Sequence, residues 1–226
     1  MEIKFKKKLS DYKYLVMFDL ASRVSGVCVF DLAKQEPLFT RVIKVDGSLV
    51  EELPAAELKQ QIDNFFLDLI HREIPLSDIV VSKECMPMQV HGSSTINTFV
   101  ALARSHAILD VYCYEHAIDV YDYTGVYPAS THAYYKKLLG CDQETKVTKE
   151  MIRDYLYQIY PNLKELTLDE SDAVFLAKTL YDVKINHDIE ERIRQIKRHR
   201  KTLKSESAIK KLNEQIEFLN SLKTTN

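Results

Sequence analysis

The chain has 226 residues, of which 46% are hydrophobic and 28% are charged, proportions that are ordinary for a globular protein. No apolar run reaches the roughly 20 residues needed to cross a bilayer, and no apolar segment of signal-peptide type follows the basic N-terminus. We therefore expect a cytoplasmic protein without a membrane partner. The cysteines lie far apart, without the spacing of zinc ligands, so buried free thiols are expected.

Basic residues gather in two places, although the formal net charge is only −2. Lys4, Lys6, Lys7 and Lys8 form one cluster, and the run from Arg192 to Lys204 contains no acidic residue. This asymmetry suits a polyanionic partner, although a basic run is more often a solvated helix face.

The first part of the chain predicts three strands. Tyr14 to Leu20 (YLVMFDL) is a buried strand that carries an acid, and Gly26 to Leu32 follows after a short turn. Leu38 to Val45 alternates between apolar and polar residues. Because the links are short, we expect an antiparallel meander.

Helices and strands then alternate. Pro54 to Arg72 has apolar residues at helical spacing, and a fourth strand opens at Asp78 and ends at Glu84. A helix is expected from Thr95 to Val111, and a fifth strand from Ala117 to Tyr123. This order fits an RNase H-like α/β fold, with a five-stranded mixed sheet and helices on both faces, although doubly wound folds also alternate.

The remainder predicts helices only, over Tyr127 to Leu139, Thr148 to Tyr160 (with Thr148 as N-cap) and Leu168 to Lys184. The tail carries two apolar seams out of register, which indicates two helices or one bent helix. We place a domain boundary near Asn186, giving a catalytic domain over 1–186 and a basic helical tail over 187–226.

Four acids fall where such a fold would bring them together. Asp19 lies within a buried strand, and Glu84 ends the neighbouring one. Asp169 and Asp172 are three residues apart, so a helix places both on one face. Taken singly, Asp19 could be a turn residue, and the helix acids could simply favour a helix N-terminus.

Clustered carboxylates repel one another, and hard divalent cations relieve this repulsion. Oxygen ligands alone suit Mg²⁺ or Mn²⁺. Two such ions, about 4 Å apart, support phosphodiester hydrolysis. We therefore predict Asp19, Glu84, Asp169 and Asp172 as ligands of two ions per active site.

The segment FDLASRVSGVCVFD resembles the first hairpin of the RuvC family of Holliday-junction resolvases, through Asp19, Ser22, Arg23, Ser25 and Gly26. Other family motifs are matched in the acid after the fourth strand, in the helix that follows it, and in TKEMI and TLDESDAVFLAKT. The matching residues there are Glu84, Asn97, Ala101, Leu102, Ala103, Arg104, Lys149, Asp169, Asp172, Ala173 and Ala177.

The resemblance implies a homodimeric endonuclease of DNA recombination and repair that nicks two strands of a four-way or branched DNA, with Lys149 near the scissile phosphate. It implies no small-molecule cofactor. Lys149 could equally be an ordinary surface lysine. The residues expected to contact DNA are basic ones: Arg23, Arg104, Lys136, Lys137, Lys149, Arg198, Arg200 and Lys201.

Two departures bear on substrate choice. Ala21 stands where the family has glycine, and Pro87 stands where it commonly has an aromatic. A divergent, phage-type enzyme with broader activity on branched DNA would fit. The alternatives are another RNase H-like nuclease acting on flaps or RNA–DNA hybrids, and a non-catalytic junction-binding protein. An actin-like phosphotransferase would need a second glycine-rich loop, which the five glycines do not supply.

Overall fold

The structure, a computed structural model, describes residues 9–46, 53–86, 96–121, 126, 128–142, 144–200 and 206–221. Its strands are β1 (Tyr14–Asp19), β2 (Val24–Asp31), β3 (Glu36–Lys44), β4 (Ile79–Lys83) and β5 (Asp119–Val120). Its helices are α1 (Leu53–His71), α2 (Ile96–Glu115), α3 (Pro128–Leu139), α4 (Lys149–Ile159), α5 (Leu168–Arg200) and α6 (Glu206–Ser221), with short 3₁₀ turns at Leu9–Asp11 and Leu76–Asp78.

The strands form one mixed sheet in the order β3-β2-β1-β4-β5. Strands β1, β2 and β3 pair antiparallel, as the predicted meander requires, whereas β4 is parallel to β1 and β5 is parallel to β4. The five-stranded mixed sheet and the α/β fold of RNase H type are therefore confirmed. The adjacency of β1 and β4, on which the predicted site depends, is confirmed as well.

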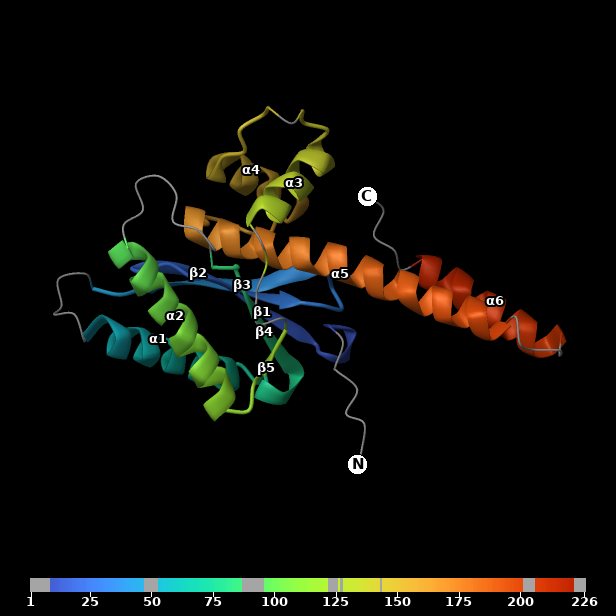
Figure 1. The fold of residues 1–226 in the computed structure, drawn as a ribbon, viewed down its shortest axis with the longest axis horizontal. Helices are drawn as coiled ribbons and strands as arrows, with labels where there is room; N and C mark the ends of the chain where they lie inside the picture. Colours follow the sequence, from blue (N-terminus) through green and yellow to red (C-terminus); the bar gives the residue numbers. More distant parts are fainter. Residues whose placement is uncertain are drawn as a thin grey trace. The chain divides into compact units, whose positions relative to one another are not determined.

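The two faces of the sheet have different partners (Figure 1). Alternate residues of each strand point to opposite faces. Val16, Phe18 and Val81 belong to the core shared with α1 and α2, where Phe65 and Phe66 also pack. The opposite face is covered by the first turns of α5 (Figure 1), which are buried through Ala173 to Ala177. Asp19 alternates with Phe18 and so lies on the α5 face.

The largest differences from the expected boundaries are in β5 and α5. Strand β5 has two residues, Asp119–Val120, and residues 122–125 of its predicted span lie outside the described residues. Helix α5 does not end at Lys184 but continues to Arg200, because the sequence there offers no glycine or proline to stop it.

The chain divides into two compact units, Met1–Thr179 and Leu180–Asn226. The domain boundary near Asn186 stays a prediction. The tail is helical, as expected, with α6 following the end of α5. In the part of the chain that the structure describes, no helix is long and apolar enough to cross a membrane. The cytoplasmic location stays a prediction.

Candidate active site

Two of the predicted acids meet at the end of the central strands. The backbone N–H of Glu84 donates to the carbonyl of Phe18 over 2.9 Å, which continues the parallel ladder to the residue beside Asp19. The side chains of Asp19 and Glu84 are hydrogen-bonded to each other. Since both carboxyls are largely buried, one proton shared between them lowers the electrostatic cost of their proximity.

Helix α5 supplies the other two acids, and a capping box fixes where it begins. The Thr167 hydroxyl accepts from the backbone N–H of Glu170 over 3.2 Å, and the Glu170 carboxylate accepts from the backbone N–H of Thr167 over 3.0 Å. The same carboxylate accepts from the Thr40 hydroxyl of β3 over 2.8 Å. This network ties the first turn, with Asp169 and Asp172, to the sheet.

Gly26 allows that first turn to lie directly on the sheet. It pairs with Asp19 across β1 and β2. A Cβ atom at Gly26 would lie 1.9 Å from the backbone oxygen of Asp169, closer than real contacts allow. The missing side chain therefore brings the start of α5 close to Asp19.

Lys149 joins the acids from a separate helix. It is the first residue of α4, and the predicted N-cap is confirmed, since the Thr148 side chain accepts from the backbone N–H of Met151. The Lys149 ammonium lies 2.5 Å from Asp172 Oδ2 and 3.4 Å from Asp169 Oδ1. Lys149 is thus a cation held within the acidic cluster, which an ordinary surface lysine would not be.

Asp19, Glu84, Lys149 and Asp172 line one cavity of about 310 Å³. Asp169 does not line the cavity, but it contacts Lys149 at the rim. The lining also includes residues that the sequence did not single out: Thr131, His132, Val147, Ile152, Phe175 and Leu176. No motif pointed to Thr131 and His132, because α3 enters the site only through the tertiary fold.

Burial raises the pKa of three carboxyls in this cavity. For Asp19 the next cause is the charge of Asp172, and for Glu84 it is the charge of Asp19. Burial also raises the pKa of Asp172, although Lys149 acts against the shift. Burial lowers the pKa of Lys149, but the bond to Asp172 and the surrounding charges more than offset it, so that the pKa is raised. The site stabilises a cation and disfavours further negative charge.

The donor set has the ligand chemistry that a hard divalent cation prefers, since three half-buried carboxyls in the cavity and a fourth beside Lys149 offer only oxygen. The spacing is not that of an assembled metal site, because no group of three or more metal-ligating side chains among the described residues is close enough to hold an ion. The negative charge of the cluster is only partly offset, by Lys149 and by the hydrogen bond within the Asp19–Glu84 pair. An incoming ion would have to replace both.

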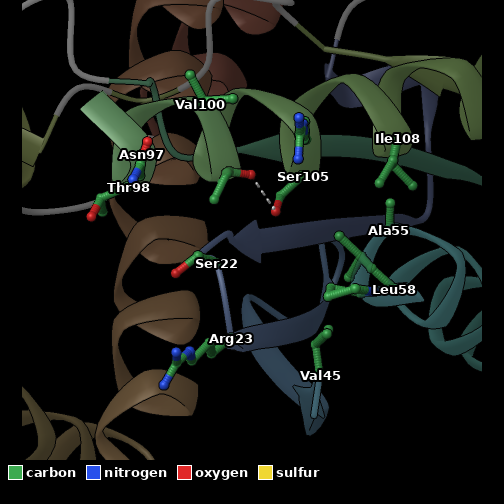
Figure 2. Close-up of a pocket in the computed structure, with 13 residues that line it drawn as sticks. Ser22, Arg23, Val45, Ala55, Leu58, Asn97, Thr98, Val100, Ser105 and Ile108 are labelled. Atoms are coloured by element: carbon green, nitrogen blue, oxygen red, sulfur yellow. Dashed lines mark hydrogen bonds between the residues drawn. The ribbon is translucent and has the colours of Figure 1, made fainter. Parts of the chain in front are cut away.

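The predicted DNA-contacting residues do not all gather at this cavity. Arg23 and Arg104 line a second cavity of about 790 Å³, part of which is shown in Figure 2. Lys136 and Lys137 lie in the last turn of α3 and line neither cavity. The side chains of Arg198 and Arg200 at the end of α5 are not described. Lys201 and Pro87 lie outside the described residues, as does the basic cluster at the N-terminus.

One further polar pair lies beneath the site, on the α2 face of the sheet. The Lys83 ammonium is 2.5 Å from Asp110 Oδ1, and its side chain is only 3% exposed. His106, one turn earlier on α2, is also buried, and its pKa falls to about 4 through burial and the charge of Lys83. This ion pair connects α2 to Lys83, which ends β4 and directly precedes Glu84.

No family model matches the chain, and no curated protein matches it. Some solved structures do match the chain. The Thermus thermophilus RuvC in complex with a Holliday junction substrate shares 15% identity at a TM-score of 0.55, covering 77% of this chain and 96% of that one. Another structure of Thermus thermophilus RuvC shares 14% identity at a TM-score of 0.54, covering 76% and 96%.

The yeast mitochondrial Holliday junction resolvase also matches, at 12% identity and a TM-score of 0.48, covering 93% of this chain and 84% of that one. The likeness to the two Thermus structures shows that the chain has a RuvC-like fold. At the level of the fold, the resemblance noted in the sequence is confirmed.

Proposed function

We propose that the chain is a divalent-metal-dependent endonuclease that resolves Holliday junctions or related branched DNA by paired nicks, in DNA recombination and repair. The observation that carries the proposal is the convergence of Asp19, Glu84, Asp172 and Lys149, from four separate elements, on one cavity. A protein that only bound DNA would gain nothing from buried carboxylates near phosphates. The RuvC-like fold supports the choice of substrate, because one of its neighbours was solved with a Holliday junction.

In this proposal Asp19, Glu84, Asp169 and Asp172 hold Mg²⁺ or Mn²⁺, as two ions per site. When bound, the ions would activate water and stabilise the charge on the leaving oxygen. Asp19 and Glu84 must give up their shared proton before they can act as ligands. Release of this proton makes the site sensitive to pH.

Lys149 has two roles within the same proposal. Without an ion, its ammonium balances Asp172 and Asp169. If those carboxylates held ions, the Lys149 ammonium would be free to contact a phosphate oxygen of the DNA and to stabilise the charge that develops there during cleavage.

Paired nicks need two copies of the site, so we propose a homodimer on four-way DNA. Arg23, Arg104, Lys136 and Lys137, together with the basic end of α5, are the proposed phosphate contacts. Such contacts release counterions and make affinity depend on salt. A phage-type origin and broader activity on branched DNA remain part of the proposal.

The test is cleavage of a synthetic four-way junction with and without Mg²⁺ or Mn²⁺, beside a duplex and a flap of the same sequence. We expect metal-dependent nicks in the junction and much slower cleavage of the controls. Asp19→Asn should abolish nicking while junction binding persists, because a carboxamide is a poor ligand for Mg²⁺. Equal cleavage of the flap would favour another RNase H-like nuclease. Binding without cleavage under any divalent ion would favour a non-catalytic protein.

A further inference from the structure

The cavity of about 790 Å³ is more than twice the volume of the catalytic one and is built from different elements. Figure 2 shows Ser22 and Arg23 from the turn after β1, Ala55 and Leu58 from α1, and Asn97, Thr98 and Val100 from the first half of α2. We call this space the β1–α2 cleft. The β1–α2 cleft lies next to the acidic cavity, separated from it by a single turn.

The β1–α2 cleft is cationic. Its lining contains Arg23 and Arg104 but no acidic residue. Both arginines are exposed, and among the described residues neither forms an ion pair. The catalytic cavity, by contrast, is lined by Asp19, Glu84 and Asp172. Unpaired guanidinium groups bind phosphate oxygens well, so the charge of the cleft favours a phosphorylated ligand.

Much of the lining of the cleft is apolar, although Ser22, Asn97, Thr98 and Ser105 also line it. Its apolar residues include Pro54, Ala55, Leu58, Val100 and Ile108. Leu58 is buried, whereas Val100 is 39% exposed and presents its side chain at the surface. An apolar wall beside two guanidinium groups matches a nucleotide, whose base has a flat apolar face and whose phosphate is an anion.

The β1–β2 turn connects the two cavities. Asp19 lines the catalytic cavity and Ser22 lines the cleft, so their Cα atoms are at most about 11 Å apart along the chain. The turn is held in place, since the Ser25 hydroxyl accepts from the Ala21 N–H over 3.1 Å. Because a DNA strand rises about 3.4 Å per nucleotide, this separation spans about three nucleotides.

We propose that the β1–α2 cleft binds one nucleotide of the cleaved strand, within about three nucleotides of the scissile phosphate. The base packs on the apolar wall that includes Val100, and Arg23 and Arg104 contact the flanking phosphates. The cleft would thereby select branched DNA, in which a base near the crossover can leave its stack at low cost. This inference rests on the proposed nuclease function.

The test is an abasic scan of a synthetic four-way junction, with one base at a time removed within four nucleotides of the branch point. Dissociation constants are measured in EDTA, so that no strand is cut, for the wild-type protein, for Val100→Glu and for Leu67→Glu. Leu67 is a matched control, since it is 51% exposed on α1 and lines neither cavity. The cut site is mapped in parallel with Mg²⁺.

For the wild-type protein and Leu67→Glu, removal of one base should weaken binding about tenfold at a single position, the size expected for one enclosed base. For Val100→Glu, removal of the same base should weaken binding less than twofold, because the introduced carboxylate already excludes the base from the cleft. A flat scan, or a full penalty retained by Val100→Glu, overturns the inference. If Mg²⁺ cleavage proceeds while the scan is flat, the cleft assignment alone fails. If no divalent ion supports cleavage, the nuclease function fails, and the scan still decides whether the cleft holds a base.

Discussion

Gly26 is the residue whose replacement tests most sharply how the fold builds the site. The Cβ of Gly26→Ala would lie 1.9 Å from the Asp169 oxygen and 2.5 Å from its carbonyl carbon, whereas ordinary contact begins at 3.4 Å. Because both groups belong to the backbone, the start of α5 must retreat by about 1.5 Å. That retreat carries Asp169 and Asp172 away from Asp19 on the neighbouring strand.

The effects of this displacement on stability and on the cleavage rate can both be estimated. Overpacking of this kind costs about 1–3 kcal/mol of unfolding free energy, which lowers the melting temperature by about 5 °C in a chain of this length. A displacement of about 1 Å in a catalytic group lowers the rate roughly 100-fold. Gly26→Ala should therefore remain folded but lose at least this much cleavage rate, measured in single-turnover assays on a four-way junction at saturating Mg²⁺, with calorimetry alongside.

Gly140→Ala is the matched control, because it adds the same methyl group where nothing lies within 4 Å. Its φ of +62° makes alanine unfavourable there, so it should cost a comparable amount of stability, about 1–2 kcal/mol. Its cleavage rate should stay at the wild-type level. If Gly26→Ala also cleaved within threefold of wild type, the close approach of α5 would not be needed for the site.

Three other predictions follow from the same structure. In EDTA, the melting temperature should fall as pH rises from about 6.5, above which His106 is uncharged in both the folded and the unfolded chain, to about 8, the raised pKa of Glu84, which is hydrogen-bonded to Asp19. The reason is that the folded state keeps protons that the unfolded chain releases. Asp19→Asn should flatten this fall, and Mg²⁺ should stabilise most at the alkaline end. Asp110→Ala should lower the free energy of unfolding by about 3–5 kcal/mol, because it leaves the buried ammonium of Lys83 without its partner. Lys83→Met should lower it less, because the carboxylate that then lacks a partner is 35% exposed. Arg23→Gln combined with Arg104→Gln should lower the slope of log affinity against log salt by about 2.

Each of these predictions has a contrary result. A melting temperature that rises across the same pH range would mean that the buried carboxyls are not protonated in the folded state. Equal losses of stability from Lys83→Met and Asp110→Ala would contradict the claim that an unpaired Lys83 ammonium costs more than an unpaired Asp110 carboxylate. An unchanged salt slope would show that the arginines of the β1–α2 cleft do not contact phosphates. Lys164→Gln, at an exposed lysine outside both cavities, is the control for loss of a single surface charge.

Much of the scaffold is encoded locally and was predictable. Alternating or continuous apolar residues define β1 to β4, and the Thr148 cap places Lys149 at the start of its helix. Asp19 was recognisable because a charged residue inside a buried strand needs a partner. The TLDE segment before Asp172 encodes the capping box between Thr167 and Glu170, a signal that sequence alone could have provided.

The rest depends on contacts between distant segments. His132 reaches the cavity only because α3 packs on α5, where Tyr134 and Tyr135 contact Phe175. The sequence around His132 has no motif. Lys83 looks like a solvated residue at a strand end, yet Asp110, 27 residues later, pairs with it beneath the sheet. The role of Gly26 is similar, since its φ is not positive and the need for glycine arises from the backbone of Asp169.

The most direct test of the central claim is the product formed from a supercoiled plasmid that extrudes a cruciform, incubated with the protein and Mg²⁺. A resolvase with two matched sites cuts both strands of the four-way junction within one bound complex, so the account predicts linear plasmid as the first product. With Asp19→Asn the plasmid should stay supercoiled. Nicked circles that accumulate without linear plasmid, or equal cutting of a plasmid without the cruciform, would contradict a junction-resolving function.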